Sequence, residues 1–170
     1  MESLLAKASI QETLHRLAYA QDELDRSALQ DLFIPNEPIP FDASHHMSHI
    51  PAAEVTPDQL WEAVYPHSAG FTATRHMLGN MLVTFEGEGF TKAHVKCQID
   101  AYHCIDRREE GGALESVTAR GLWLMDVEVW EGKWVFRKIT IRRDVPLDHP
   151  ELYAVAVERS GKGMGRKAKE

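Results

Sequence analysis

Hydrophobic positions follow two different spacings along the chain. After Ser9 they recur every three or four residues up to position 24, which predicts an amphipathic helix that reaches about Glu23. The segment SIQE, from Ser9 to Glu12, fits a capping box at the start of this helix. A second short helix is predicted to begin at SALQ, near Ser27, and to end near Phe33.

The middle of the chain, residues 35–68, is interrupted by prolines at positions 35, 38, 40, 51, 57 and 66. Proline lacks a backbone donor and restricts φ, so long regular elements are not expected there. One short helix is predicted over TPDQLWEAV. Thr56 is its expected N-cap, Pro57 occupies the first turn and Gln59 completes a capping box.

After Phe71 the hydrophobic spacing becomes two, which is typical of strands. The predicted strands are residues 74–86, 91–105, 115–130 and 134–144. The connections GEG, DRREEGGA and EGK consist of turn-forming residues suited to hairpins. Helices followed by a meander of long strands predict an α+β fold, with helices packed on one face of a curled antiparallel sheet.

Composition and charge narrow the class of protein. The chain has 170 residues with 44% hydrophobic content, which fits one domain over residues 1–150. Its net charge of -7 and pI of about 5.7 do not suggest a nucleic-acid partner. The basic, glycine-rich segment RSGKGMGRKAKE ends a C-terminal extension, residues 151–170, and is expected to be disordered at its end. No apolar stretch is long enough for a signal peptide or a membrane span, so a cytoplasmic protein is expected.

The strand over residues 95–105 places a histidine among apolar neighbours. Its odd positions are apolar except for His103, so this imidazole is predicted to face the interior. Cys97 and Cys104 are seven residues apart and therefore point to opposite faces, which argues against a disulfide between them. For His76 both faces of the strand are apolar, and this pattern indicates a strand that is covered on both sides.

Asp22 lies at the edge of the apolar stripe of the first helix. If that helix covers the inner face of the sheet, Asp22, His76 and His103 converge in one cavity. A neutral imidazole is a base near physiological pH, and a buried carboxylate on its other nitrogen would fix the tautomer. The alternative is a structural one, in which Asp22 is partly exposed and His76 is a core residue with its hydrogen bonds satisfied.

Four segments carry a resemblance to a known family: LAYAQDELDRSALQDLF, ATRHMLGNMLV, AHVKCQIDAYH and RGLWLMDVEVWEGKWVFRKITIRRD. Over residues 10–144 the chain resembles the SnoaL-like branch of the nuclear-transport-factor-2-like (NTF2-like) superfamily. It is similar in particular to the group of scytalone dehydratase and bile-acid 7-alpha-dehydratase. The resemblance implies a cone-shaped fold, in which helices close a strongly curved antiparallel sheet around a deep apolar pocket.

The same resemblance implies roles for individual residues. An aspartate late in the first helix pairs with a strand histidine in these enzymes, and the matching positions are Asp22 and His76. A second histidine of scytalone dehydratase falls at His103, with Asp100 as the competing alignment. Gln21 and Phe41 stand where scytalone dehydratase has tyrosines that help to polarise the carbonyl of its substrate, which implies a different substrate here.

Other side chains are candidates for the pocket or for a metal. The predicted pocket residues are Tyr19, Phe41, Trp61, Asn80, Trp123 and Arg142. Arg142 is chosen over Arg143 because it shares parity with Trp134 and Phe136. The loop SHHMSH, with His45, His46 and His49, lacks acidic or cysteine partners, so no metal site is expected.

Two hypotheses of function follow. The first is a cofactor-independent lyase or isomerase that acts on a small, hydrophobic, cyclic polyketide- or terpenoid-like substrate of secondary metabolism. His76 would be the base, Asp22 its orienting partner, and His103 an acid or a group that polarises the carbonyl. The second is a non-catalytic binding or structural subunit with the same fold. By analogy with the family, a homodimer is expected.

Overall fold

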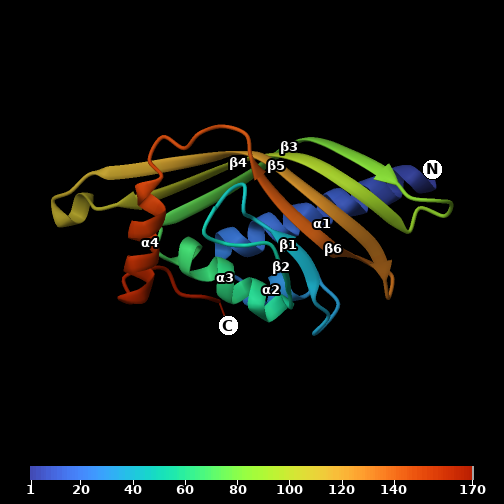
Figure 1. The fold of residues 1–170 in the computed structure, drawn as a ribbon, viewed down its shortest axis with the longest axis horizontal. Helices are drawn as coiled ribbons and strands as arrows, with labels where there is room; N and C mark the ends of the chain where they lie inside the picture. Colours follow the sequence, from blue (N-terminus) through green and yellow to red (C-terminus); the bar gives the residue numbers. More distant parts are fainter. Residues whose placement is uncertain (170) are drawn as a thin grey trace.

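A six-stranded sheet in the order β2-β1-β6-β5-β4-β3 forms the framework of the protein (Figure 1). It is seen in a computed structural model that describes residues 1–169, apart from the side chain of residue 110. The strands are β1 (Ile39–Asp42), β2 (Ala53–Val55), β3 (Ala73–Phe85), β4 (Lys92–Asp106), β5 (Leu114–Trp130) and β6 (Lys133–Arg143). The helices are α1 (Glu2–Glu23), α2 (Arg26–Gln30), α3 (Pro57–Ala69) and α4 (Glu151–Gly161), with a short 3-10 turn, η1 (Arg108–Glu110).

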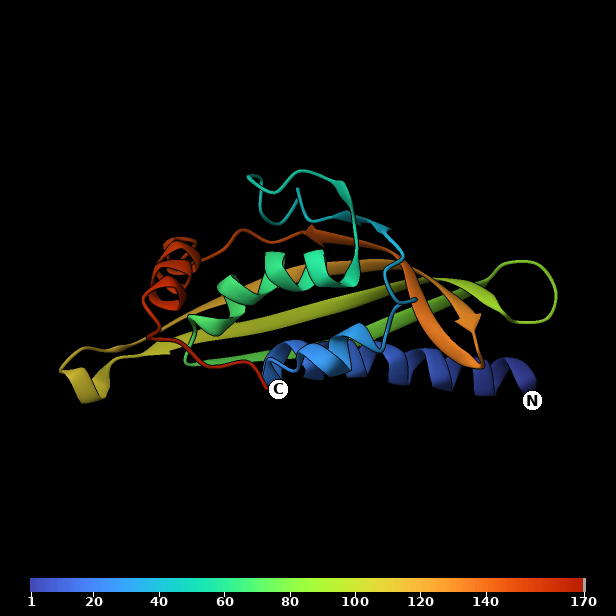
Figure 2. The same ribbon diagram turned by 90° about the horizontal axis from the view of Figure 1, so that it is seen from below.

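The α+β architecture is confirmed: α1, α2 and α3 lie on one face of the sheet, and α4 stands near one end (Figures 1 and 2). The pairs β3–β4, β4–β5 and β5–β6 are antiparallel, as the meander predicts. The sheet is less curved than the predicted cone. β4 and β5 pair over 15 residue pairs without a bulge, so the central ladder stays extended.

Two short strands were not predicted, because both lie in the proline-rich segment. β1 pairs in parallel with β6 and antiparallel with β2, which extends the sheet beyond the meander. Pro40 is accommodated in β1 with its side chain exposed. Short strands next to a sheet edge tolerate proline, so the prolines limited the length of these elements without preventing them.

The first helix is longer than predicted. It begins at Glu2, so Ser9 lies inside it and the predicted capping box at SIQE is not formed. Instead, Thr13 donates to the backbone carbonyl of Ser9 at 3.0 Å. The residues before Ser9 are mostly good helix formers, so nothing ends the helix there. Its buried stripe contains Ile10, Leu14, Leu17 and Ala18, as the spacing predicts.

The capping box of α3 is confirmed: the Thr56 hydroxyl accepts from the backbone of Gln59, and the Gln59 side chain accepts from the backbone of Thr56. α3 then continues to Ala69, beyond the predicted segment. Its inner side buries Leu60 and Trp61 in the main core between helices and sheet.

β3 is an edge strand and is not covered on both sides, which corrects the prediction from its apolar faces. Its neighbour is β4 alone, and Met77 and Leu82 on the outer face are 60% and 65% exposed. Thr74, His76 and Leu78 pair with the inward-facing His103, Ala101 and Ile99 of β4. The alternation in β3 therefore points His76 toward the interior.

The C-terminal extension is packed against the domain, which differs from the disorder that its composition suggests. α4 buries Leu152 and Ala156 against Phe71, Ile105 and Val117. Beyond α4, the backbone N–H of Arg166 donates to Ala69 at 2.7 Å, and that of Lys169 to Leu24 at 2.9 Å. These contacts join segments that are far apart in sequence, which composition alone does not reveal.

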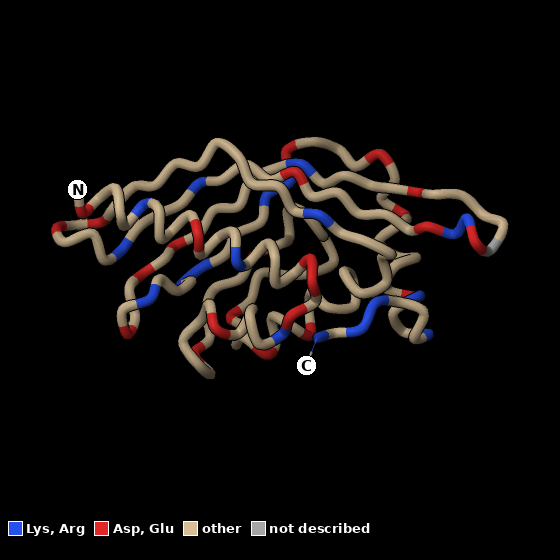
Figure 3. Tube along the Cα trace, turned by 180° about the vertical axis from the view of Figure 1, so that it is seen from behind, with Lys and Arg blue, Asp and Glu red and all other residues tan. Residues whose placement is uncertain are grey.

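Charged residues are distributed over the whole trace. Figure 3 shows lysines and arginines interspersed with acidic residues along the strands and helices. Among the described residues, no helix is both long enough and apolar enough to cross a membrane. Cys97 and Cys104 are free thiols and both are buried.

Candidate active site

The predicted contact between Asp22 and His76 is present. Asp22 lies at the end of α1 and is 7% exposed, and its Oδ1 atom is 2.7 Å from Nδ1 of His76. Its Oδ2 accepts the backbone N–H of His76 at 2.8 Å, and the Thr74 hydroxyl donates to Oδ1 at 2.8 Å. Burial alone would raise the pKa of this carboxyl. The hydrogen bonds from His76, the positive charge of that ring when it is protonated and the bond from Thr74 lower the pKa by more, so it lies below its ordinary value.

This contact determines the tautomer of His76. A carboxylate can only accept, so Nδ1 carries the proton and Nε2 keeps the lone pair. The side chain of His76 is 10% exposed, and its ring packs beside those of His103 and Trp123 at centroid distances of 5.5 and 5.9 Å. Asp22 therefore holds the ring of His76 in one orientation and leaves Nε2 free to act as a base.

His103 faces the interior, as predicted, next to His76. Asp100, the competing alignment, lies on the outer face and receives a hydrogen bond from Arg120 at 2.9 Å. Nδ1 of His103 is 3.0 Å from the carbonyl oxygen of Ala101, so this nitrogen carries the proton. Burial, together with the neighbouring charge on His76, lowers the pKa of His103 to about 3. His103 is thus neutral near pH 7 in the folded protein, and its role as an acid or a polariser of the carbonyl stays a prediction.

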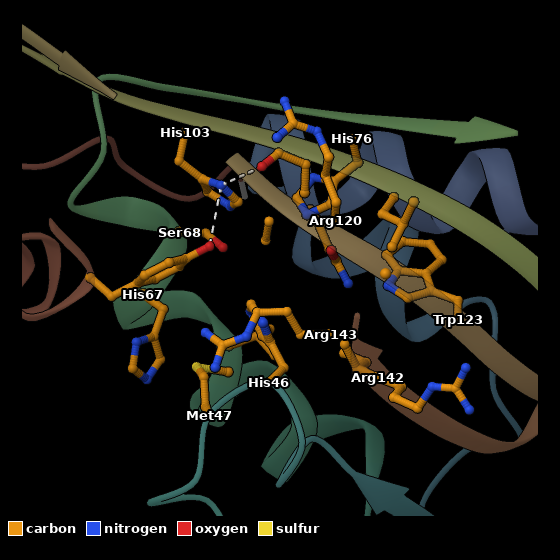
Figure 4. A pocket seen from close by; sticks show the side chains of 18 residues that line it. His46, Met47, His67, Ser68, His76, His103, Arg120, Trp123, Arg142 and Arg143 are labelled. Carbon is orange, nitrogen blue, oxygen red and sulfur yellow. Dashed lines mark hydrogen bonds between the residues drawn. The ribbon is translucent and has the colours of Figure 1, made fainter. Parts of the chain in front are cut away.

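A cavity of about 80 Å³ lies between the inner face of the sheet, α3, α4 and the loop after β1 (Figure 4). A cavity needs roughly 10–15 Å³ of such volume to hold one water molecule, so this one has room for several waters or a small ring. His76 and His103 line it together with Trp123, and Tyr153 of α4 closes one side. The Tyr153 hydroxyl is 3.4 Å from Nδ1 of His103, and burial raises the pKa of this phenol.

Arg143, rather than Arg142, is the inward arginine of β6, which corrects the prediction. A bulge at Arg137 shifts the pairing, because Val127 pairs with Phe136 whereas Asp126 pairs with Lys138. Parity with Phe136 therefore fails beyond the bulge. Arg142 borders the cavity, but its guanidinium points away from it (Figure 4) and donates to Asp144 at 2.9 Å.

Four of the six predicted pocket residues lie outside the cavity, and only Trp123 and Arg142 border it. Tyr19 is on the outer side of α1 and is 59% exposed. Phe41 and Trp61 are buried in the core, where Trp61 stacks on Tyr65. The exposed Asn80 donates to Gln98 on the neighbouring strand at 2.5 Å.

The sequence did not identify several residues that line the cavity, among them His46, His67, Arg143 and Tyr153. His46 comes from the SHHMSH loop, whose histidines had been considered only as metal ligands. Burial lowers the pKa of His46 to about 4, and the charge of Arg143 acts in the same direction. Among the side chains that the structure describes, no three metal-ligating residues come together in a geometry that could hold a metal ion.

The fold and the site together define the class: a small α+β protein whose helices cover one face of a sheet, with a buried carboxylate–histidine pair at a cavity. Residues 2–140 match the SnoaL-like domain family, so the chain belongs to this family, which is part of the NTF2-like superfamily. No curated protein is significantly similar to it in sequence.

Several solved structures share the fold. The Kfla4162 protein of Kribbella flavida has a TM-score of 0.74 and 16% identity, over 89% of this chain and 97% of that one. A candidate scytalone dehydratase of Novosphingobium aromaticivorans has a TM-score of 0.66 and 18% identity, over 84% and 86%. The hexachlorocyclohexane dehydrochlorinase LinA-type3 of Novosphingobium barchaimii has a TM-score of 0.62 and 16% identity, over 84% and 88%. At such identities the likeness establishes the fold, which is shared with dehydratases and dehydrochlorinases.

Proposed function

We propose that the protein is a cofactor-independent lyase or isomerase, which removes a proton next to a carbonyl group of a small cyclic substrate. The observation that carries this proposal is the Asp22–His76 pair, joined at 2.7 Å at the wall of a cavity. The pair leaves Nε2 of His76 as a basic nitrogen, and the carboxylate stabilises the imidazolium that forms when this nitrogen takes a proton.

The first step is common to dehydration, double-bond migration and cyclisation. Nε2 of His76 takes the proton, the C–H bond breaks, and its electron pair moves toward the carbonyl oxygen to form an enolate. In a dehydration, the enolate expels a hydroxyl group from the neighbouring carbon, and the imidazolium returns its proton to give water. In an isomerisation, the same proton returns to a different carbon.

The other groups at the cavity suit this chemistry. Among the described residues Arg143 has no acidic partner, so its positive charge is available to a developing enolate oxygen. His103 keeps a lone pair on Nε2, because its proton is on Nδ1. We therefore assign His103 to accept a hydrogen bond from a substrate hydroxyl, in place of the predicted roles as an acid or a polariser of the carbonyl.

The apolar walls formed by Ile99, Ala101, Trp123 and Ile141 favour a hydrophobic ring, in line with the polyketide- or terpenoid-like substrate that the sequence suggests. A filled interior or a solvent-facing Asp22 would favour the non-catalytic alternative. The cavity and the burial of Asp22 support the enzyme over this alternative. The expected homodimer stays a prediction.

Deuterium uptake from D₂O tests the first step without a choice among the later ones. The substrates would be a panel of one- and two-ring cyclic ketones with and without a β-hydroxyl group, followed by NMR against an enzyme-free blank. We expect uptake next to the carbonyl of at least one compound. His76→Ala should reduce the rate by roughly 10²–10⁴-fold, the usual contribution of a positioned base.

His94→Ala is the matched control, because this histidine lies outside the cavity and is bonded to Glu86 and Asp126 at 2.7 and 2.6 Å. It should exchange at the wild-type rate. An active protein whose rate is unaffected by His76→Ala would remove His76 from the reaction. A wild-type protein that binds members of the panel without exchange would favour the non-catalytic alternative.

A further inference from the structure

Arg166, in the segment after α4, extends its side chain into the domain behind the Asp22–His76 pair. Its guanidinium donates to the backbone carbonyl oxygens of Asp22, Ser68 and Phe71 at 2.5, 2.8 and 3.1 Å. It also donates to the Thr74 hydroxyl at 3.1 Å. An arginine that is distant in sequence therefore contacts Asp22 and one of the hydrogen-bond donors of its carboxylate.

The backbone around Arg166 is fitted to this position. The N–H of Arg166 donates to the carbonyl of Ala69 at the end of α3 at 2.7 Å. Gly165 has no space for a side chain, because a Cβ atom there would lie 2.3 Å from the carbonyl oxygen of Ala69. The backbone from which the Arg166 side chain extends is therefore held against the end of α3.

Thr74 connects Arg166 to the carboxylate. A hydroxyl group has one proton, and Thr74 directs it to Oδ1 of Asp22 while its lone pair accepts from Arg166. A charged donor polarises the hydroxyl and strengthens the bond that this hydroxyl donates. Burial lowers the pKa of Arg166, while the nearby charge of Asp22 favours its charged form, so the two charges interact.

We propose that Arg166 is a positioning residue of the candidate active site. It fixes the end of α1 at Asp22 and, through Thr74, the direction of the carboxylate that orients His76. This inference rests on the proposed function, because the orientation of His76 matters for a reaction only if His76 is the base. The orientation itself can be measured without a substrate. Arg166 does not contact the cavity, so it is not expected to touch a ligand.

The test is hydrogen exchange at Nδ1–H of His76, measured by NMR on ¹⁵N-histidine-labelled full-length protein at neutral pH. In the wild type, this proton should exchange slowly because Asp22 holds it. Arg166→Met should accelerate exchange about tenfold or more, the effect of weakening one net hydrogen bond. Arg166→Lys should recover only part of the protection, because the compact ammonium lacks the planar fork whose three nitrogens reach Thr74 and the backbone carbonyls together.

Arg159→Met is the matched control. Arg159 also fastens the C-terminal segment by bonds to backbone carbonyls, of Gly70 at 3.1 Å and Met164 at 3.5 Å, but it contacts neither Asp22 nor Thr74. Both methionine variants should lower thermal stability, whereas only Arg166→Met should alter the His76 proton. Equal protection of this proton in Arg166→Met and Arg159→Met would assign Arg166 a structural role alone and overturn the proposal.

Thr74→Val gives a second route if Arg166→Met does not fold. It removes the hydroxyl that links Arg166 to Asp22 and should also accelerate the exchange about tenfold. Unchanged protection in Thr74→Val would break the link and overturn the proposal. Failure of the proposed function is a separate result, because it would appear as undiminished deuterium uptake by His76→Ala.

Discussion

A carboxylate that is buried as deeply as Asp22 stays charged only if donors surround it. Asp22 has three donors: the Thr74 hydroxyl and two N–H groups of His76. His76 donates twice to this carboxylate, once from its backbone N–H and once from its ring, so both the backbone and the side chain of His76 are held by Asp22. The orientation of the imidazole therefore follows from the strand position as well as from the side-chain contact.

Neutral buried histidines make the stability of the fold depend on pH. The pKa of His103 falls from its ordinary 6.5 to about 3, so the unfolded chain takes up a proton at mildly acidic pH that the folded protein does not. The free energy of unfolding should therefore decrease as the pH falls from about 6.5, by at most ~1.4 kcal/mol per pH unit for this histidine.

His103→Asn should reduce this dependence, because the asparagine amide can still donate to Ala101 and does not titrate. Urea unfolding between pH 7 and pH 4 would measure the slope, with the exposed His45→Asn as the control. Equal slopes in wild type and His103→Asn would contradict a neutral His103 in the folded protein.

At this scale the sequence predicted the positions of the three central residues in the fold. The apolar register of β4 identified His103 as inward, and the stripe of α1 together with the family resemblance identified Asp22 and His76. The aromatic candidates were less predictable, because Trp61 and Phe41 have the same pattern in a core as in a pocket. Tyr153 lies on α4, a helix that was not predicted, and the inward direction of Arg143 depends on the bulge in β6.

At the scale of elements, the bulge in β6 determines which of the two adjacent arginines points toward the cavity. The apolar parity changes in this strand, from Trp134 and Phe136 to Ile139 and Ile141. The adjacent Arg137 and Lys138 mark the extra residue, a signal that a parity counted from Phe136 overlooks. The four meander strands themselves were predicted to within one residue of their bounds, since long alternating runs are a strong signal. The start of α1 was missed, because a local capping box cannot compete with seven further residues that favour helix.

The bulge leads to a prediction about two adjacent arginines. Arg143→Met should reduce deuterium uptake by roughly 10²-fold or more, as expected for loss of one group that stabilises a developing oxyanion. Arg142→Met should stay within a few-fold of the wild type, because its guanidinium is engaged with Asp144 on the other face. The deuterium-uptake assay measures both, and a larger loss in Arg142→Met would mean that the bulge does not set the inward face.

At the scale of the whole molecule, α4 and the segment after it attach the C-terminal part of the chain to the ends of α1 and α3. α4 carries Tyr153 to the cavity, and its approach to α3 depends on Gly70, where a Cβ atom would lie 1.7 Å from the carbonyl oxygen of Ala156. The sequence predicted the α+β arrangement but not this closure. The contacts of this closure span up to 146 residues, from Lys169 to Glu23, and local patterns carry no signal for them.

Gly70→Ala should therefore separate α4 from α3 and lower the free energy of unfolding by about 1–3 kcal/mol, the usual cost of overpacking. Gly161→Ala is the matched control, because no atom lies within 4 Å of the added Cβ at the end of α4. Urea unfolding followed by tryptophan fluorescence would compare the two. A Gly70→Ala variant as stable as Gly161→Ala would show that α4 can shift at little cost.

The place of His76 on β3 has a consequence for solubility as well as for chemistry. β3 is at the edge of the sheet, where backbone N–H groups that point outward invite another strand to add. At His76 this outward N–H is already bound by Oδ2 of Asp22. The carboxylate of Asp22 thus occupies a backbone donor that an added strand would need, so a strand could pair at this point of the edge only by displacing the group that orients the imidazole.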